Sequence, residues 1–273
     1  MGEDAGVEIL FSNKKKRGKK MALIFIDLDN TLLYNGKPAP KAILTVELLK
    51  ENNHQVVIAT GRNPNLIYGV DKVFGIDSLV LANGSYVKIA GKVIKEKYID
   101  NSVVKRMMDL ADEMKFDFVI EYFDEYISYR KDTEASDKFS KMYNLEIARL
   151  DRNFYPDRKV FAMVMFEKTV VDKIKALFPE LQFNQSSHFG FDVNPSGKLK
   201  AEGIKTVIEY LNYDSDEIYA IGDNFNDITM LEAVKHGIAM GNATEELKKV
   251  ASYVTTDVCD AGVYNAMKYY KLI

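Results

Sequence analysis

The sequence predicts an α/β protein with a Rossmann-like, doubly wound parallel-sheet core and an inserted α+β cap domain. Three short apolar runs predict the core, and they lie within residues 22–26, 54–62 and 217–223. Each run is rich in large aliphatic side chains, which is typical of a strand buried on both faces of a parallel sheet. The pattern changes after Gly84 and returns to strand–helix alternation from Asn194, which predicts the insertion.

Residues 21–87 are expected to form the first part of the core. A helical pattern covers residues 41–53, between the first two predicted strands. A second helical pattern covers residues 63–74, and Pro64 lies near its first turn, where proline is tolerated. Strands and helices therefore alternate along this segment, as in a doubly wound sheet.

Residues 88–189 are expected to form the cap, because the alternation of strand and helix gives way to hairpins. One hairpin is centred on Ala90 and Gly91, and two further strands meet near Asp124. An α+β domain on an antiparallel sheet fits this order. The predicted elements are a hairpin, a helix, a strand pair, and then strand, helix and strand, over residues 86–99, 102–114, 116–131, 158–167, 169–178 and 181–193.

Residues 190–273 are expected to complete the core. Here the patterns predict a helix, a strand and another helix over residues 199–211, 217–223 and 227–234. Short strands follow near Ile238 and Tyr253. The two ends of the chain would thus build one core around the cap.

Composition bounds the class of protein. The chain has 273 residues and 47% hydrophobic side chains, which suits one large domain or two modest ones. It has no run of about eighteen or more apolar residues, so we expect no membrane span. Its single cysteine, Cys259, excludes an internal disulfide framework and predicts a reducing, cytoplasmic location.

The net charge of −3 hides an uneven N-terminus. Residues 1–20 hold six basic and three acidic side chains, so the remaining residues carry a net charge of −6. A body with that balance is a poor general binder of nucleic acid. We expect the basic extension of residues 1–20 to be flexible and dispensable, the alternative being a localisation or polyanion-binding patch.

Two carboxylates follow the first predicted strand, at Asp27 and Asp29. Ligands of open α/β sheets bind beyond the carboxyl ends of the strands, so a site is expected here. Buried ionised carboxylates need a cation or several hydrogen-bond donors, and Mg²⁺ prefers oxygen ligands of this kind. The pair therefore predicts a magnesium site.

Polar residues also follow the other two strands. Thr60 offers a hydroxyl and Gly61 an unobstructed backbone N–H, the donors that hold a phosphoryl oxygen at a loop leading into a helix. Asp223 and Asp227 add two carboxylates at the same sheet edge. Since so many anions need a positive charge as well as a metal, a lysine near residue 200 is expected to join them.

In order and spacing, these motifs resemble the haloacid dehalogenase-like superfamily, and within it the Cof-type sugar-phosphate phosphatases with a type-two cap of subclass B. The resemblance spans nearly the whole chain from Met21, and it includes the strand end at residues 81–84. A lone D-x-D is more typical of a turn or a helix cap, and Asn83-Gly84 is a common hairpin turn. The joint occurrence of the motifs, in the family's order, favours the functional interpretation.

The resemblance implies a role for each motif. Asp27 would be the nucleophile that forms an aspartyl-phosphate, and Asp29 the general acid and base. Mg²⁺ would be held by the Asp27 side chain, the Asp29 backbone carbonyl and the Asp223 side chain. The implied phosphate-binding residues are Thr60, Gly61, Lys200 and Asn226, with Asp227 and Arg62 in support.

The lysine position departs from the family pattern, which usually shows Lys-Gly after the turn. Here the chain reads Gly197-Lys198-Leu199-Lys200. Aligning Asn194 and the following proline with the family's own Asn-Pro and counting forward places Lys200 on the family lysine, so the resemblance favours Lys200 as the phosphate-binding lysine, with Lys198 as the alternative.

The expected function is Mg²⁺-dependent hydrolysis of a small phosphorylated metabolite, either a sugar phosphate or a phosphorylated cofactor or precursor. The alternatives are a phosphohexomutase of the related branch, which would need cap arginines for a distal phosphate, and a non-catalytic sensor on the same fold. We expect no nucleic-acid or membrane partner, and the oligomeric state stays open. Candidate substrate-facing cap residues are Glu121, Tyr122, Tyr126, Tyr129, Arg130, Ser186, Ser187, His188 and Phe189.

Overall fold

The structure is a computed structural model that describes residues 21–67, 69–130, 137, 140–141, 146, 148–186, 190–197, 199–213 and 215–273. Five features named above lie outside these residues. They are the basic extension of residues 1–20, the alternative lysine Lys198, and the three cap candidates Ser187, His188 and Phe189.

In the described part of the chain, eight strands form the larger sheet, and its α/β architecture confirms the predicted fold class. The first strand lies at its centre, because Leu23 pairs in parallel with Ile218 on one side and with Gln55 on the other. In spatial order the strands are β16 (Tyr253–Val254), β15 (His236–Ala239), β14 (Ile218–Gly222), β1 (Leu23–Ile26), β4 (Gln55–Ala59), β5 (Leu79–Leu81), β6 (Tyr86–Ile89) and β7 (Lys92–Glu96).

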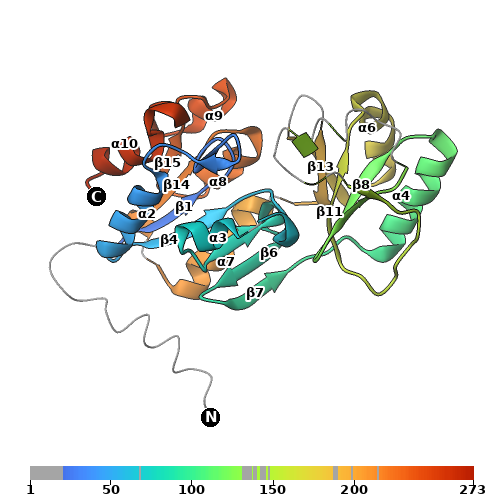
Figure 1. The fold of residues 1–273 in the computed structure, drawn as a ribbon, viewed down its shortest axis with the longest axis horizontal. Helices are drawn as coiled ribbons and strands as arrows, with labels where there is room; N and C mark the ends of the chain where they lie inside the picture. Colours follow the sequence, from blue (N-terminus) through green and yellow to red (C-terminus); the bar gives the residue numbers. More distant parts are fainter. Residues whose placement is uncertain are drawn as a thin grey trace, which may run out of the picture.

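Helices accompany the larger sheet, and its elements fill the left of Figure 1. The main ones are α2 (Ala42–Glu51), α3 (Val70–Phe74), α7 (Leu199–Leu211), α8 (Ile228–Glu232), α9 (Glu245–Val250) and α10 (Gly262–Tyr269). None of the helices in the described ranges has both the length and the apolar character needed to cross a bilayer.

The helix predicted over residues 63–74 is wrong as a single element. A short 3₁₀ helix, η1 (Pro64–Leu66), is followed by the separate helix α3. Gly69 lies between them with φ of 75°, in the left-handed region that an α-helix does not contain. The glycine therefore ends the helical run that the apolar pattern alone suggests.

The smaller sheet fills the right of Figure 1 and carries the helices α4 (Asn101–Met114) and α6 (Lys168–Ile174). Its pairs are antiparallel, as expected, except that β9 and β10 run parallel. In spatial order its described strands are β10 (Arg149–Leu150), β9 (Tyr126–Ser128), β8 (Phe118–Tyr122), β11 (Val160–Met165), β13 (Phe191–Pro195) and β12 (Leu181–Gln185).

Residues 181–193, predicted as one strand, belong to two. Leu181 on β12 pairs antiparallel with Pro195 on β13, so the chain reverses between the two strands. Apolar side chains such as Phe183 and Phe191 occur on both sides of the reversal. A polar run at residues 184–188 lies between them and Gly190 follows, so the sequence carries a turn signal that the prediction of one strand overlooks.

The expected limits of the cap also need correction. The hairpin centred on Ala90 exists, but both its strands, β6 and β7, belong to the larger sheet, because β6 pairs antiparallel with β5. The boundary at residue 88 therefore falls inside a core strand. At the other end, β13 belongs to the smaller sheet although residues 190–195 were assigned to the core. We propose that the cap consists of the smaller sheet with α4 and α6.

The two faces of the smaller sheet differ. Side chains such as Ile120, Met163 and Val193 point into an apolar cluster that also contains residues of α4 and α6. Because side chains alternate along a strand, Glu121 and Asp192 point to the opposite face. That face looks toward the larger sheet, since Asp192 accepts a hydrogen bond from Asn83.

Candidate active site

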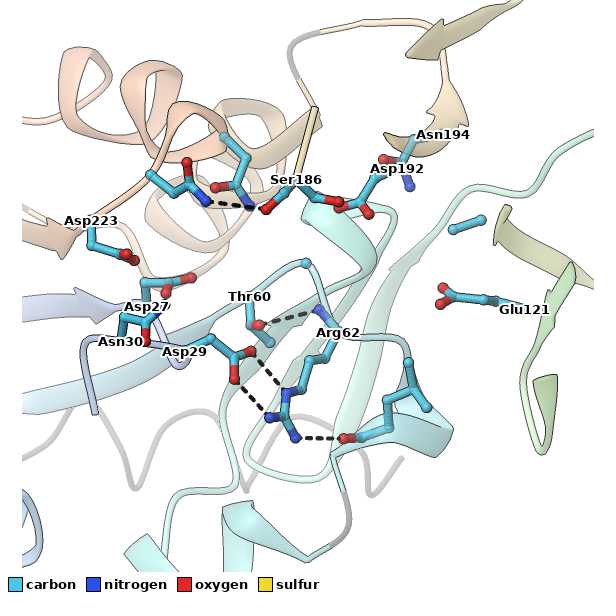
Figure 2. A pocket seen from close by; sticks show the side chains of 15 residues that line it. Asp27, Asp29, Asn30, Thr60, Arg62, Glu121, Ser186, Asp192, Asn194 and Asp223 are labelled. Carbon is cyan, nitrogen blue, oxygen red and sulfur yellow. Dashed lines mark hydrogen bonds and ion pairs between the residues drawn. The ribbon is translucent and has the colours of Figure 1, made fainter. Parts of the chain in front are cut away.

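A pocket lies between the carboxyl edge of the larger sheet and the open face of the smaller sheet (Figure 2). The larger sheet and its loops contribute Asp27, Asp29, Asn30, Thr60, Gly61, Arg62, Leu66, Asp223, Asn224 and Asn226. The smaller sheet and the segment joining its last two strands contribute Glu121, Ala162, Ser186, Asp192 and Asn194. Most of the predicted site residues therefore meet in one place.

Asp27 and Asp223 are brought together by strand pairing. β1 and β14 are parallel neighbours, and the Asp27 backbone N–H donates to the carbonyl of Ile221 over 2.9 Å. Each aspartate comes directly after its strand, so both lie at the same edge of the sheet. Only 5% of Asp27 and 8% of Asp223 are exposed, which makes their charges costly without a compensating cation.

Lys200 supplies one positive charge inside this cluster. It lies in the first turn of α7, is 2% exposed, and its Nζ is 2.8 Å from Asp27 Oδ1. The same ammonium donates to Asp227 Oδ1. Asp227 Oδ2 accepts the backbone N–H of Asp223 over 2.9 Å, so Asp227 fixes both the lysine and the loop that carries Asp223.

Burial dominates the electrostatics of the three groups. It raises the pKa of Asp27 to about 7, with a further rise from Asp227 that the attraction of Lys200 opposes. Burial, then Asp27 and Asp227, raise the pKa of Asp223 well above its usual range. Burial alone would lower the pKa of Lys200, but the carboxylates of Asp227 and Asp27 outweigh it and raise that pKa. The cluster has too little positive charge for its carboxylates.

The donor set fits a divalent cation. Carboxylate oxygens of Asp27, Asp223 and Asp227 lie within 4.8 Å of one another. Both oxygens of Asp227 already accept hydrogen bonds, whereas Lys200 engages one oxygen of Asp27. Asp27 and Asp223 are therefore the side chains open to a hard, oxygen-preferring ion.

Asp29 lies in the same pocket, but its side chain is not part of this group. Its carboxylate forms a two-point ion pair with Arg62, over 2.9 Å from Nε and 2.7 Å from Nη2. Arg62 also donates to the carbonyl of Leu66 over 3.1 Å, which holds the guanidinium against η1. Figure 2 shows the Asp29 carboxylate beside Asp27, at the edge of the pocket.

The loop of Thr60 and Gly61 is built by backbone contacts. The Thr60 N–H donates to Val80 on β5 over 2.9 Å, and its hydroxyl accepts the N–H of Arg62 over 3.2 Å. A Cβ on Gly61 would lie 3.2 Å from Asn83 Oδ1 and 3.4 Å from Asp192 Oδ2. Glycine therefore allows the close approach of a core amide and a cap carboxyl at this loop.

Asn83 joins the two sides of the pocket, a role that the hairpin-turn interpretation misses. Its Oδ1 accepts from Asn226 Nδ2 over 3.0 Å, and its Nδ2 donates to Asn194 Oδ1 over 3.1 Å and to Asp192 Oδ2 over 3.4 Å. With φ of 52°, Asn83 adopts the left-handed conformation that asparagine tolerates. Its position after the buried strand β5 was the available signal.

The cap candidates divide by strand face. Glu121 and Ser186 line the pocket, as expected. The hydroxyl of Tyr129 and the guanidinium of Arg130 instead bond to Asp112 on α4. Tyr122 also points away, because it is buried in the apolar cluster. Tyr126 lies opposite Glu121 in the strand register and shares its face, but it packs near Val119 and donates to the carbonyl of Glu146, outside the pocket lining. Sequence reasoning did not single out Ala162, Asp192 or Asn194 as substrate-facing residues.

A family model described as haloacid dehalogenase-like hydrolase matches residues 24–267 of the chain. The Bacillus subtilis (strain 168) protein YkrA is 34% identical over 247 residues, which cover 90% of this chain and 96% of that protein.

Solved structures share the fold. BT1666 from Bacteroides thetaiotaomicron, described among the phosphatases of the haloalkanoate (HAD) enzyme superfamily, matches with a TM-score of 0.84 and 27% identity, over 96% of this chain and 100% of that one. BT4131, described as a HAD subclass IIB sugar phosphatase, matches with a TM-score of 0.79 and 25% identity, over 93% of this chain and 100% of that one.

Proposed function

The chain belongs to the haloacid dehalogenase-like hydrolase family, and from that premise we propose that it is a Mg²⁺-dependent phosphatase acting through an aspartyl-phosphate on Asp27. It is a phosphoric monoester hydrolase of the type that acts on sugar phosphates and other phosphorylated metabolites. One observation carries the mechanism. Lys200 pairs with both Asp27 and Asp227, and Asp27 lines a pocket together with Asp223 and the Thr60 loop.

Asp27 is the proposed nucleophile. Its Oδ1 accepts from Lys200, so the lysine fixes the carboxylate while Oδ2 stays available for attack on the substrate phosphorus. The P–O bond to the leaving group breaks as the bond from Asp27 forms. Water then hydrolyses the acyl phosphate and regenerates the carboxylate.

Asp29 is the proposed general acid and base. It lies two residues after Asp27 in the same pocket, where it would protonate the leaving oxygen and later take a proton from the attacking water. Arg62 sets the orientation of its carboxylate through the two-point ion pair.

The phosphoryl oxygens need several donors. Thr60, Gly61, Lys200 and Asn226 would provide them, and Asp227 would keep Lys200 in place. A bound Mg²⁺, held by Asp27, Asp223 and the backbone carbonyl of Asp29, would offset the negative charge of the phosphoryl group.

A matched set of proteins tests this proposal. Phosphate release is measured with a panel of phosphorylated sugars, nucleotides and cofactors. We expect release when Mg²⁺ is present and no release when a chelator is added. Asp27→Asn should reduce the rate by about 10³-fold or more while the protein stays folded. Asp109→Asn, on the exposed face of α4, should behave as the wild type. A wild-type protein without activity on any compound, or an active Asp27→Asn protein, would contradict the proposal.

A further inference from the structure

We propose that Glu121 and Asn194 determine specificity by binding hydroxyl groups of the leaving group, and that this enzyme therefore discriminates against leaving groups with a second negative charge. The inference rests on the proposed phosphatase function and concerns the side of the pocket opposite Asp27. The phosphoryl site binds a group that every substrate has, so it cannot discriminate between substrates. The inference assigns that discrimination to two cap residues.

Strand register puts both residues at the pocket. Glu121 on β8 lies opposite Ala162 on β11, and Asp192 on β13 lies opposite Val164 on β11. Asn194 follows Asp192 by two residues, so it points to the same face. Figure 2 shows Glu121, Asp192 and Asn194 on one side of the pocket, with Asp27 and Asp223 on the other.

Two of these buried polar groups have no partner. Within the described residues, the carboxyl of Glu121, which is 6% exposed, makes no hydrogen bond or ion pair with a side chain or backbone group. The Nδ2 of Asn194, a fully buried residue, likewise has no acceptor. A buried polar group without a partner is costly, so a site with two of them is complementary to a ligand that satisfies both.

Asp192 is held in place by the protein itself. Its Oδ2 accepts from Asn83, and it lies against Gly61 of the proposed phosphate loop. Burial is the main reason that its pKa is raised. Asp192 is therefore a second carboxyl group on this side of the pocket, and it already has a hydrogen-bond partner within the protein.

A hydroxyl group satisfies both open positions. It donates to the Glu121 carboxyl and, through its oxygen lone pairs, accepts from Asn194 Nδ2. Burial, followed by Asp192, raises the pKa of Glu121 to about 8, and a hydroxyl can pair with either protonation state. A carboxylate or second phosphate could accept from Asn194 but would face two carboxyl groups.

No cation is free to compensate such a group among the described lining residues. Arg62 is the only positive side chain there, and Asp29 engages it. The five arginines between residues 88 and 189 bond to carboxylates elsewhere. Their partners are Glu180 for Arg106, Asp112 for Arg130 and Arg152, Glu125 and Asp151 for Arg149, and Asp124 and Glu125 for Arg158.

Two compounds that differ in one group test the inference. Sorbitol 6-phosphate ends in a hydroxymethyl group where 6-phosphogluconate has a carboxylate. We compare kcat/KM for both, and their inhibition constants against p-nitrophenyl phosphate hydrolysis, at pH 8.5. The wild type should favour the neutral compound about tenfold or more, because like charges brought together are strongly unfavourable.

Glu121→Gln keeps the size of the side chain and removes its charge, so it should reduce this preference to about threefold or less. The ratio is taken within one preparation, so a loss of folded protein cancels. Asp192→Asn should lower the ratio in the same direction, and it replaces Glu121→Gln if that variant does not fold. Glu113→Gln, exposed on α4, is the matched control and should keep the wild-type ratio.

The outcomes separate the two proposals. A wild-type protein that releases phosphate from other compounds but neither binds nor prefers the neutral one overturns this inference alone. An unchanged ratio in Glu121→Gln does the same. Absence of phosphate release from every compound would instead contradict the phosphatase function.

Discussion

Arg62 holds both carboxylate oxygens of Asp29, over 2.9 Å to Oδ2 and 2.7 Å to Oδ1. Both hydrogen bonds are strongest when the carboxylate is ionised, which is the form that accepts a proton from water. For Asp29 to donate a proton to the leaving group, one of these contacts must weaken. Both proton transfers proposed for Asp29 therefore depend on the position of the Arg62 guanidinium.

Replacing Arg62 with lysine tests this relationship. Lysine keeps the charge but cannot form the planar two-point contact, so we expect kcat to fall about tenfold with a smaller change in KM. Steady-state kinetics on the best substrate measure both quantities. Arg158→Lys, whose guanidinium pairs with Asp124 and Glu125 on the cap, is the control. A variant with wild-type kcat would show that the two-point contact is dispensable.

Removing the charge of Lys200 should affect stability as well as activity. Lys200→Met leaves Asp27 and Asp227 buried without their cation, and the loss of one partner from such a cluster costs about 3–5 kcal/mol. Urea unfolding monitored by circular dichroism measures this loss in the metal-free protein. Lys205→Met, on the exposed side of α7, should stay near the wild type. A stable and active Lys200→Met protein would direct attention to Lys198.

Magnesium should stabilise the folded protein. An ion that binds only the folded state adds about 3 kcal/mol when its free concentration is a hundred times its Kd. We therefore expect the unfolding temperature to rise by several degrees on addition of Mg²⁺ and to fall again with chelator. Asp223→Asn should lose most of this rise and Asp109→Asn none. An equal rise in all three proteins would place the ion elsewhere.

The buried Glu121 predicts a pH dependence of stability. Its pKa is about 8 in the folded protein against an ordinary value of 4.5, so between these two pH values the folded state binds more protons than the unfolded state. The free energy of unfolding therefore falls as pH rises from about 4.5 to about 8, in total by a few kcal/mol, and this change then stops.

Glu121→Gln has no proton to lose, so the difference in unfolding free energy between wild type and variant isolates this effect. Between pH 5 and pH 8, the free energy of unfolding of the variant should rise relative to that of the wild type. Glu113→Gln, at an exposed site on α4, is the matched control for the loss of one carboxyl group. A constant difference for Glu121→Gln would mean that Glu121 is ionised throughout this range.

The core of the site was predictable because strand ends are visible in sequence. Asp27 and Asp223 each follow a short apolar run, and parallel strands bring such ends to one edge. Lys200 was placed by the resemblance, through the family's Asn-Pro, and the structure puts its ammonium between Asp27 and Asp227. Local pattern was sufficient wherever a residue's place depends on one strand and the order of the chain.

The cap side of the pocket was not predictable in the same way. Glu121 and Tyr122 are adjacent, yet one faces the pocket and the other the apolar cluster. Which of the two faces in depends on the register of β8 with β11, which is set by long-range packing. Asp192 was missed because residues 181–193 were interpreted as one strand, across the polar run at residues 184–188.

The central place of β1 has a consequence for how the protein is made. Lys200 and Asp27 are 173 residues apart in sequence, and β14, which covers one edge of β1, comes later still. While the ribosome is producing the cap, β1 therefore has an uncovered edge of the kind that pairs with other chains. We expect nascent chains that stop before residue 223 to be inactive and prone to aggregation, so the enzyme gains its activity only after β14 and Asp223 have been made.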